Sequence, residues 1–191
     1  MHSIAVWLPI VSVVAVYVGR VMELRTRRDT VPGAIAETLT LRLFLLAGAL
    51  MLTGSLVEYY RRGEGLRWWS FLTGWACAVA SFVIRWRAIA ALGKFWSLHV
   101  EIRADHQFVQ SGPFRWMRHP TYFSMILELV LVGLILNVYY SLLAVSFLFV
   151  PTLLLRIKLE EALLVEKFGD TYRDYQKTTP ALFPYKLPHP Q

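Results

Sequence analysis

Two polar segments of the chain carry the side chains that could do chemistry. The first covers residues 85–120 and holds three of the five histidines, His99, His106 and His119. Imidazole is a common metal ligand, but no carboxylate cluster accompanies these histidines and their spacing matches no metal motif. We therefore expect no metal site. The alternative for each histidine is a polar residue that hydrogen-bonds to the backbone.

The end of this segment indicates a helix start. Ser111, Gly112 and Pro113 are typical of a turn. Pro120 suits the first turn of a helix, because a backbone N–H at that position has no partner within the helix and proline has none to leave unbonded. His119 would then be the N-cap, beside N–H groups that are not bonded within the helix. Such a helix start favours an anionic group of a ligand.

The second segment covers residues 156–191 and begins with a possible ion pair. Arg156 and Glu160 are four residues apart, so on a helix they share one face, whereas Glu161 points about 100° away. The simplest interpretation is an exposed pair that contributes roughly 0.3–0.5 kcal/mol. Charged residues with spaced aromatics follow over residues 168–175, which favours an amphipathic helix lying against a membrane surface.

Apolar runs make up most of the remaining sequence. Hydrophobic residues are 56% of the 191 residues and charged residues only 17%, too few to coat a soluble globule. A membrane-spanning helix needs roughly 17–25 apolar residues. Such runs cover residues 3–19, 43–57 and 68–84, and residues 122–155 divide at Asn137 into two short spans. We predict an all-α integral membrane protein with about five transmembrane helices, two of them in a tight hairpin.

The basic residues indicate the orientation of these spans. The net charge is +7, and five alternating spans place 17 of the 20 Lys and Arg residues on one side. The other side holds Arg61, Arg62 and Arg67. By the positive-inside rule, the N-terminus lies outside and both polar segments lie in the cytoplasm. The single cysteine, Cys77, lies in an apolar run and excludes a disulfide framework.

Glu128 is the one charged residue inside residues 122–155. Carboxylates inside a membrane are functional candidates, because they are costly to keep there. Glu128 could pair with an arginine or act as a base toward a hydroxyl substrate. The alternative is a residue near the interface whose side chain reaches water.

The motifs together resemble a known family. The run VQSGPFRWMRHPTY, a two-helix hairpin, R-x-x-x-E-E-x-x-L and F-G-x-x-Y-x-x-Y are similar to the isoprenylcysteine carboxyl methyltransferases, which are related to membrane phospholipid methyltransferases. The resemblance covers roughly residues 85–184. The family usually has glycine where this chain has Ser124.

The resemblance implies an S-adenosylmethionine-dependent enzyme with a cytoplasmic C-terminal cofactor pocket and a lipophilic substrate that enters from the bilayer. Residues 1–84 would form three N-terminal spans, and residues 85–191 the methyltransferase core. Family cofactor contacts fall on His99, His106, Gln107, Phe108, Val109, Phe114, His119, Pro120, Thr121, Tyr122 and Glu160. Arg156 falls where the family holds substrate, and Arg85, with Arg87 as a rival, falls on an arginine needed for activity.

The methyl acceptor stays open. A carboxylate acceptor needs an arginine clamp, for which Arg85 or Arg156 is suited, whereas a hydroxyl acceptor needs a base such as Glu128. These three residues are the catalytic candidates. We expect an oxygen acceptor on a prenylated or other lipid-like substrate, with no nucleic acid partner. The alternatives are N-methylation of a phospholipid amine and a non-catalytic structural or transport protein.

Overall fold

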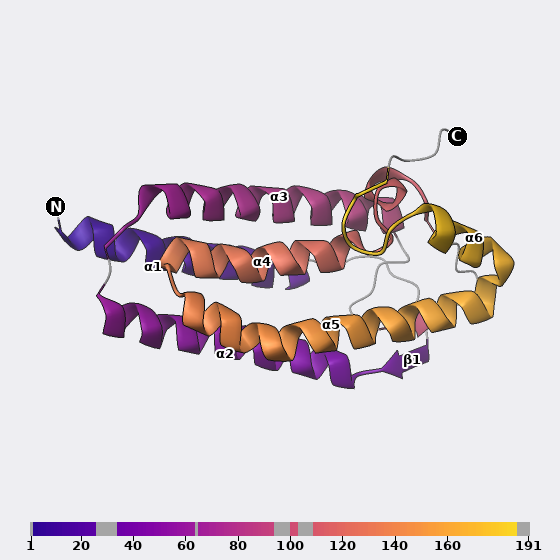
Figure 1. Cartoon of the computed structure of the whole chain (residues 1–191), viewed down its shortest axis with the longest axis horizontal. Coiled ribbons are helices and arrows are strands. Elements are labelled where there is room, and N and C mark those ends of the chain that lie inside the picture. The colour runs from indigo at the N-terminus through magenta and orange to yellow at the C-terminus, as the bar shows by residue number, and fades with distance from the viewer. Residues whose placement is uncertain (1, 26–33, 64, 94–99, 103–108, 187–191) are drawn as a thin grey trace.

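The computed structural model describes residues 2–25, 34–63, 65–93, 100–102 and 109–186, and they form a helical bundle (Figure 1). The long helices are α1 (His2–Arg25), α2 (Leu39–Arg62), α3 (Trp68–Leu92), α4 (Pro120–Leu136) and α5 (Tyr139–Phe168), and a short amphipathic helix, α6 (Asp170–Thr178), follows. The helical prediction is confirmed.

Each predicted apolar run corresponds to one long helix. Among the described residues, α1, α2, α3 and α5 are long and apolar enough to cross a membrane. Helix α4 has 17 residues. It rises roughly 25 Å, less than the hydrocarbon layer of about 30 Å. Five spans therefore remain a prediction, with α4 as the short one.

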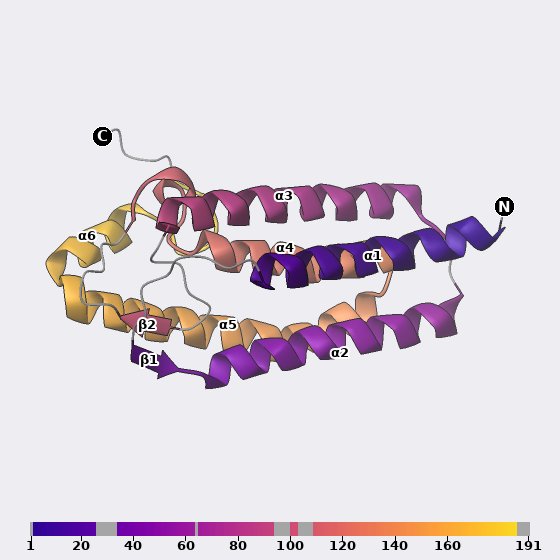
Figure 2. The same cartoon turned by 180° about the vertical axis from the view of Figure 1, so that it is seen from behind.

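Two short strands were not predicted from the sequence. β1 (Ala34–Glu37) pairs antiparallel with β2 (Val100–Ile102). Runs of three and four residues are too short for an alternating pattern to stand out against the neighbouring helices. Figure 2 shows this pair near the α6 end of the bundle.

The two ends of the bundle differ in what they hold. The N-terminus, the connection between α2 and α3 and the turn between α4 and α5 lie at one end (Figure 1). Helix α6, β1 and the 3-10 helix η2 (Gly112–Arg115) lie at the other. The bundle therefore brings the polar segments before α4 and after α5 to the same end.

The hairpin between α4 and α5 is held from both sides. Asn137 ends α4 in the left-handed conformation, with φ of 56°. Glu58 of α2 then caps α5, because its carboxylate accepts hydrogen bonds from the backbone N–H of Tyr140 (3.2 Å) and of Ser141 (2.7 Å). These capping bonds satisfy donors that a helix start otherwise leaves open, so the chain can reverse with two residues between the helices.

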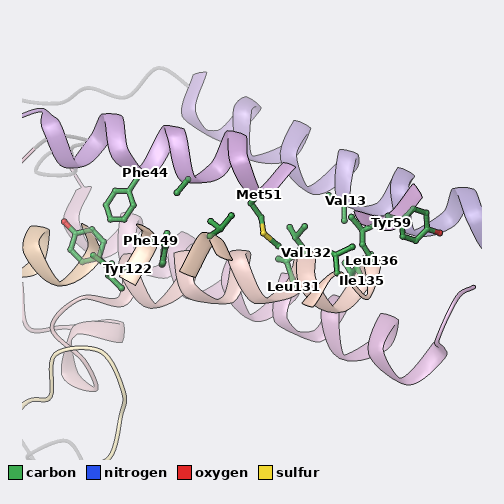
Figure 3. Packing of buried hydrophobic residues seen from close by; sticks show 14 of the residues in the cluster. Val13, Phe44, Met51, Tyr59, Tyr122, Leu131, Val132, Ile135, Leu136 and Phe149 are labelled. Atoms are coloured by element: carbon green, nitrogen blue, oxygen red, sulfur yellow. The ribbon is translucent and has the colours of Figure 1, made fainter. Parts of the chain in front are cut away.

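The core lies along α4. In Figure 3, Met51 of α2 packs beside Leu131 and Ile135 of α4, and all three are almost fully buried. Large apolar side chains also cover the outside of the bundle, for example Phe147 at 76% exposure. A soluble protein rarely exposes so much apolar surface, and lipid contact explains it.

Candidate functional site

The site is built around the start of α4. The helix begins at Pro120 with His119 as its N-cap, so the predicted helix start is confirmed. The chain after α6 closes over it: the N–H groups of Arg118 and His119 donate to the carbonyl oxygens of Pro180 and Ala181, both at 2.9 Å. The backbone N–H of the N-cap residue itself is therefore used within the protein.

Glu161 joins three elements at this point. Its Oε1 accepts from Arg118 Nε at 2.7 Å and lies 2.9 Å from His119 Nε2. Its Oε2 accepts from the Gln176 side chain at 2.9 Å. His119 is only 3% exposed, and a carboxylate partner requires its Nε2 to carry the hydrogen. Glu161 of α5 thus fixes the start of α4 and the body of α6.

Tyr122 lies one turn further along α4 and joins two charged residues of α5. Its ring stacks on that of His119, with centroids 5.3 Å apart. Its hydroxyl donates to Glu160 Oε2 and accepts from Arg156 Nε at 2.9 Å. Arg156 and Glu160 therefore share one helical face, as predicted, and the Tyr122 hydroxyl bridges them.

Arg156 is buried among aromatic rings. Its Nη1 donates to Thr40 Oγ1 of α2 at 3.0 Å, and its Cζ lies 5.9 Å from the ring centres of both Phe44 and Tyr122. Rings at this distance attract a guanidinium through their negative faces. We call Tyr122, Arg156 and Glu160 with His119 and Glu161 the α4–α5 group.

Phe114 of η2 is buried and connected to α6. Its carbonyl oxygen accepts from the Tyr175 hydroxyl at 2.5 Å, and the Tyr175 ring lies 5.8 Å from that of Tyr172. Burial raises the pKa of both tyrosines well above the ordinary value. Both hydroxyls therefore stay protonated, and that of Tyr175 keeps the hydrogen that ties α6 to η2.

A second charged group lies between α1, α3 and α4. We call Arg20, Glu23, Arg85 and Glu128 the quartet. Arg85 Nε donates to Glu23 Oε2 at 2.8 Å, and its Nη1 pairs with Glu128 Oε1. Arg20 lies 3.0 Å from Glu23 and 3.7 Å from Glu128. The two arginines and two carboxylates sum to zero charge.

The two groups lie on different faces of α4. Tyr122 and Glu128 are six residues apart, which places them about 120° apart around the helix. The α4–α5 group and the quartet have no residue in common among their described contacts. The structure thus does not bring Arg85 and Arg156 together around a single ligand position. Of the possibilities for Glu128, pairing with an arginine is observed.

The other sequence candidates are placed as follows. Pro120 is buried, while Val109 and Thr121 are partly exposed. Arg85 is buried and Arg87 is exposed, which distinguishes the two rival arginines. His99, His106, Gln107 and Phe108 lie outside the described residues. Across the described ranges, no group of three or more His, Cys, Asp or Glu residues is placed to hold a metal ion.

The sequence candidates lack one member of the α4–α5 group, Glu161, and two members of the quartet, Arg20 and Glu23. The helical spacing predicts only that Glu161 points away from Arg156, and that direction is what brings it to His119. Arg20 and Glu23 lie three apart at the end of the first apolar run, and this spacing signals a charged helix face. Their partner Arg85 is 62 residues beyond Glu23, so nothing local in the sequence identifies it.

Comparisons with known proteins agree with this architecture. Residues 74–166 match the isoprenylcysteine carboxyl methyltransferase (ICMT) family. The Bacillus subtilis protein YpbQ, described as uncharacterized, is 31% identical over 100 residues, covering 52% of this chain and 58% of that protein. The protein-S-isoprenylcysteine O-methyltransferase of Dictyostelium discoideum is 31% identical over 113 residues, covering 58% of this chain and 46% of that enzyme. Protein-S-isoprenylcysteine O-methyltransferase B of Arabidopsis thaliana is 27% identical over 160 residues, covering 80% and 81%.

A solved structure shares the fold. The eukaryotic intramembrane Ras methyltransferase ICMT superposes with a TM-score of 0.66 at 26% identity, covering 72% of this chain and 52% of that one. The chain spans 58% of the length of the Bacillus protein and 46% of that of the Dictyostelium enzyme. Its matched segment holds most of α3, all of α4 and all but the end of α5. Over residues 74–166, just under half of its length, and in its fold, this integral membrane protein is similar to the isoprenylcysteine carboxyl methyltransferase family.

Proposed function

We propose that the protein is a membrane methyltransferase that moves a methyl group from S-adenosylmethionine to an oxygen of a lipophilic, membrane-borne substrate. The observation that carries the proposal is the α4–α5 group. Two motifs more than thirty residues apart meet there, and Tyr122 joins Arg156 to Glu160. A buried cation, a carboxylate and aromatic rings within one small volume suit a ligand that carries charges of both signs.

The residues at the start of α4 fit S-adenosylmethionine. That molecule supplies an electrophilic methyl group on a sulfonium, and it also carries an ammonium, a carboxylate and an adenine. Glu160 offers a carboxylate for a cation, and the rings of Tyr122 and Phe114 offer faces for a cation or for adenine. We propose that His99, His106, Gln107, Phe108, Val109, His119, Pro120 and Thr121 complete this binding site.

Arg156 is the proposed contact for the acceptor. Its guanidinium lies between the Phe44 and Tyr122 rings, near Phe149, whose ring centre is 5.4 Å from that of Phe44. Apolar walls suit a lipid-like chain, and a guanidinium suits a polar oxygen at its end. Such walls also exclude water, so alignment of the acceptor with the donor methyl supplies much of the acceleration.

Arg85 and Glu128 act from the other face of α4. Glu128 pairs with Arg85, and its Oε1 also lies 3.2 Å from Ser81 Oγ. The product decides between the two oxygen acceptors: a methyl ester requires only that a carboxylate is held, whereas a methyl ether requires a base, the role proposed for Glu128.

The proposed orientation places this chemistry in the cytoplasmic half of the membrane. The end of the bundle with α6 and η2 belongs to the side with 17 of the 20 Lys and Arg residues. The N-terminus would then lie outside. Residues 85–191 would supply the methyl-transfer machinery and residues 1–84 most of the lipid-facing support.

The direct test uses the purified protein in lipid nanodiscs with labelled S-adenosylmethionine and a lipid extract. A labelled lipid with a methyl ester or methyl ether supports the proposal. A product methylated on nitrogen supports the phospholipid N-methyltransferase alternative and contradicts the oxygen acceptor. A protein that labels no acceptor and binds no donor contradicts enzymatic function.

A matched pair of variants on α5 tests the donor site. Glu160→Gln removes the charge that Tyr122 contacts, and Glu166→Gln changes an exposed residue of the same helix. We expect calorimetric titration with S-adenosylhomocysteine to show weaker binding by roughly tenfold for Glu160→Gln, about the value of one charge-assisted contact. Equal affinities for both variants would exclude Glu160 from the site.

A further inference from the structure

We propose that Glu23 of α1 is a positioning residue for methyl transfer: acting through Arg85 and Ser81, it sets the placement of the first turns of α4. This inference rests on the function proposed above, because His119 and Tyr122 on those turns form part of the proposed donor site. It also assigns a role to α1, which lies outside the family match at residues 74–166.

Arg85 needs two carboxylates because of where it lies. It is part of the apolar helix α3, and its side chain is only 7% exposed. An unpaired guanidinium there would lose its hydration without replacement. Glu128 of α4 pairs with Nη1, and both oxygens of Glu23 accept from Nε, at 2.8 and 3.1 Å. Held at two nitrogens from two helices, the guanidinium has a defined orientation.

A chain of hydrogen bonds transmits that orientation to α4. Arg85 Nη1 donates to Ser81 Oγ at 3.3 Å, and Ser81 Oγ donates to the Ser124 carbonyl oxygen at 3.0 Å. Ser124 in turn donates its hydroxyl to the Thr121 carbonyl oxygen at 2.7 Å. Ser81 and Ser124 are almost completely buried, so little water is present to replace these bonds. This series of hydrogen bonds ends at Thr121, which lies between His119 and Tyr122 in the sequence.

The placement of α1 depends on these charges at this end of the bundle. At the other end of the bundle, the Tyr59 hydroxyl donates to the Val6 carbonyl oxygen of α1 at 2.9 Å. Between the two ends of α1, Val13 packs in the core. Large apolar residues of α1, such as Met22, face outward. Figure 2 shows α1 lying along α4 between α2 and α3. Apolar contact alone would tolerate a small sliding of α1, whereas an ion pair has a defined geometry.

Charge balance and positioning can be separated by two variants. Glu23→Gln leaves Arg20 and Arg85 with one carboxylate between them, an excess of one positive charge. The double variant Arg20→Gln with Glu23→Gln restores neutrality but still leaves Arg85 Nε without its carboxylate. Arg173→Gln is the control, because it breaks an exposed pair on α6. If Glu23 only balances charge, the double variant behaves like the wild-type protein.

The experiment measures two quantities in nanodiscs. The first, hydrogen exchange of the backbone amides over residues 118–126 without ligand, needs no enzymatic activity. We expect exchange there to be about tenfold faster in Glu23→Gln and in the double variant than in Arg173→Gln, with exchange over residues 143–155 unchanged. The second is affinity for S-adenosylhomocysteine, which we expect to fall roughly fivefold or more in both variants. The thermal midpoint should recover in the double variant while these two readouts do not.

The outcomes separate the two proposals. Wild-type exchange over residues 118–126 in Glu23→Gln overturns the positioning role, whatever happens to thermal stability. Full recovery of exchange and affinity in the double variant also overturns it, since charge balance would then suffice. A wild-type protein that binds no donor overturns the proposed function, and the exchange data still decide whether Glu23 places α4.

Discussion

Glu161 holds α4, α5 and α6 together, and its three partners determine how much this contact contributes to the free energy of unfolding. Its carboxylate accepts from Arg118, lies within hydrogen-bond distance of His119 Nε2, and accepts from the Gln176 amide. Glu161→Ala leaves all three groups without this partner, in a place where Arg118 is 11% exposed. Removing one member of a buried pair costs about 3–5 kcal/mol. For a chain of this size that corresponds to a thermal midpoint about 6–20 °C lower.

Glu161→Gln is the informative comparison, because the amide has nearly the same shape. Its oxygen can still accept from Arg118 and His119, and the Gln176 amide can turn to offer its oxygen to the new NH₂ group. The variant therefore loses charge rather than hydrogen bonds. Charge-assisted bonds are roughly twice as strong as neutral ones. The expected cost is about 1–2 kcal/mol, or a midpoint about 2–8 °C lower.

The assay is thermal unfolding at one heating rate in one detergent, monitored by the change in tryptophan fluorescence. Glu166→Ala and Glu166→Gln on the exposed face of α5 are the controls. The expected order of midpoints is wild type and both controls, then Glu161→Gln, then Glu161→Ala. If Glu161→Ala unfolds with the controls, the three partners contribute nothing to stability. If Glu161→Gln falls as far as Glu161→Ala, charge alone accounts for the contact and the hydrogen bonds do not.

Two further predictions concern topology and packing. The topology is tested with single cysteines at Gly65, Gln110 and Lys186, in a protein whose Cys77 is replaced by alanine. We expect the cysteines at Gln110 and Lys186 to be labelled from the cytoplasmic side and the one at Gly65 from the opposite side. Labelling of all three from one side would contradict the predicted orientation. Gly74→Ala should lower the free energy of unfolding by about 1–3 kcal/mol, as is typical of overpacking, and so lower the thermal midpoint, because a Cβ there would lie 2.5 Å from the Ile135 side chain and 3.1 Å from its backbone nitrogen. A midpoint equal to that of the wild-type protein would show that α3 and α4 can separate freely.

The helices could be predicted from the sequence because each depends on a local property. Uncharged runs long enough to cross a bilayer are visible without any partner, and Asn137 marks the hairpin turn by its tolerance of the left-handed conformation. The start of α4 could be predicted for the same reason, since Pro120 restricts the backbone without any partner elsewhere in the chain.

Partners across the bundle could not be predicted in this way. Glu58 caps α5 from a distance of 82 residues along the chain, and Glu23 reaches Arg85 over 62. A glutamate near the end of an apolar run has the same sequence signature whether it faces water or another helix. The resemblance supplied every member of the α4–α5 group except Glu161. Of the quartet it supplied only Arg85, and it could not supply Arg20 and Glu23 because α1 lies outside the motifs that carry it.

The spacing within the motifs explains why the α4–α5 group forms as it does. His119 and Tyr122 are three apart, so they lie one above the other on α4 and their rings can stack. Adjacent glutamates on α5 point about 100° apart, which lets Glu161 reach His119 while Glu160 reaches Tyr122. A shift of either helix by one residue would break both contacts at once. The two motifs therefore specify the register of α4 against α5 at the polar end, as Glu58 does at the other, and the register fixes where Arg156 and Tyr122 meet.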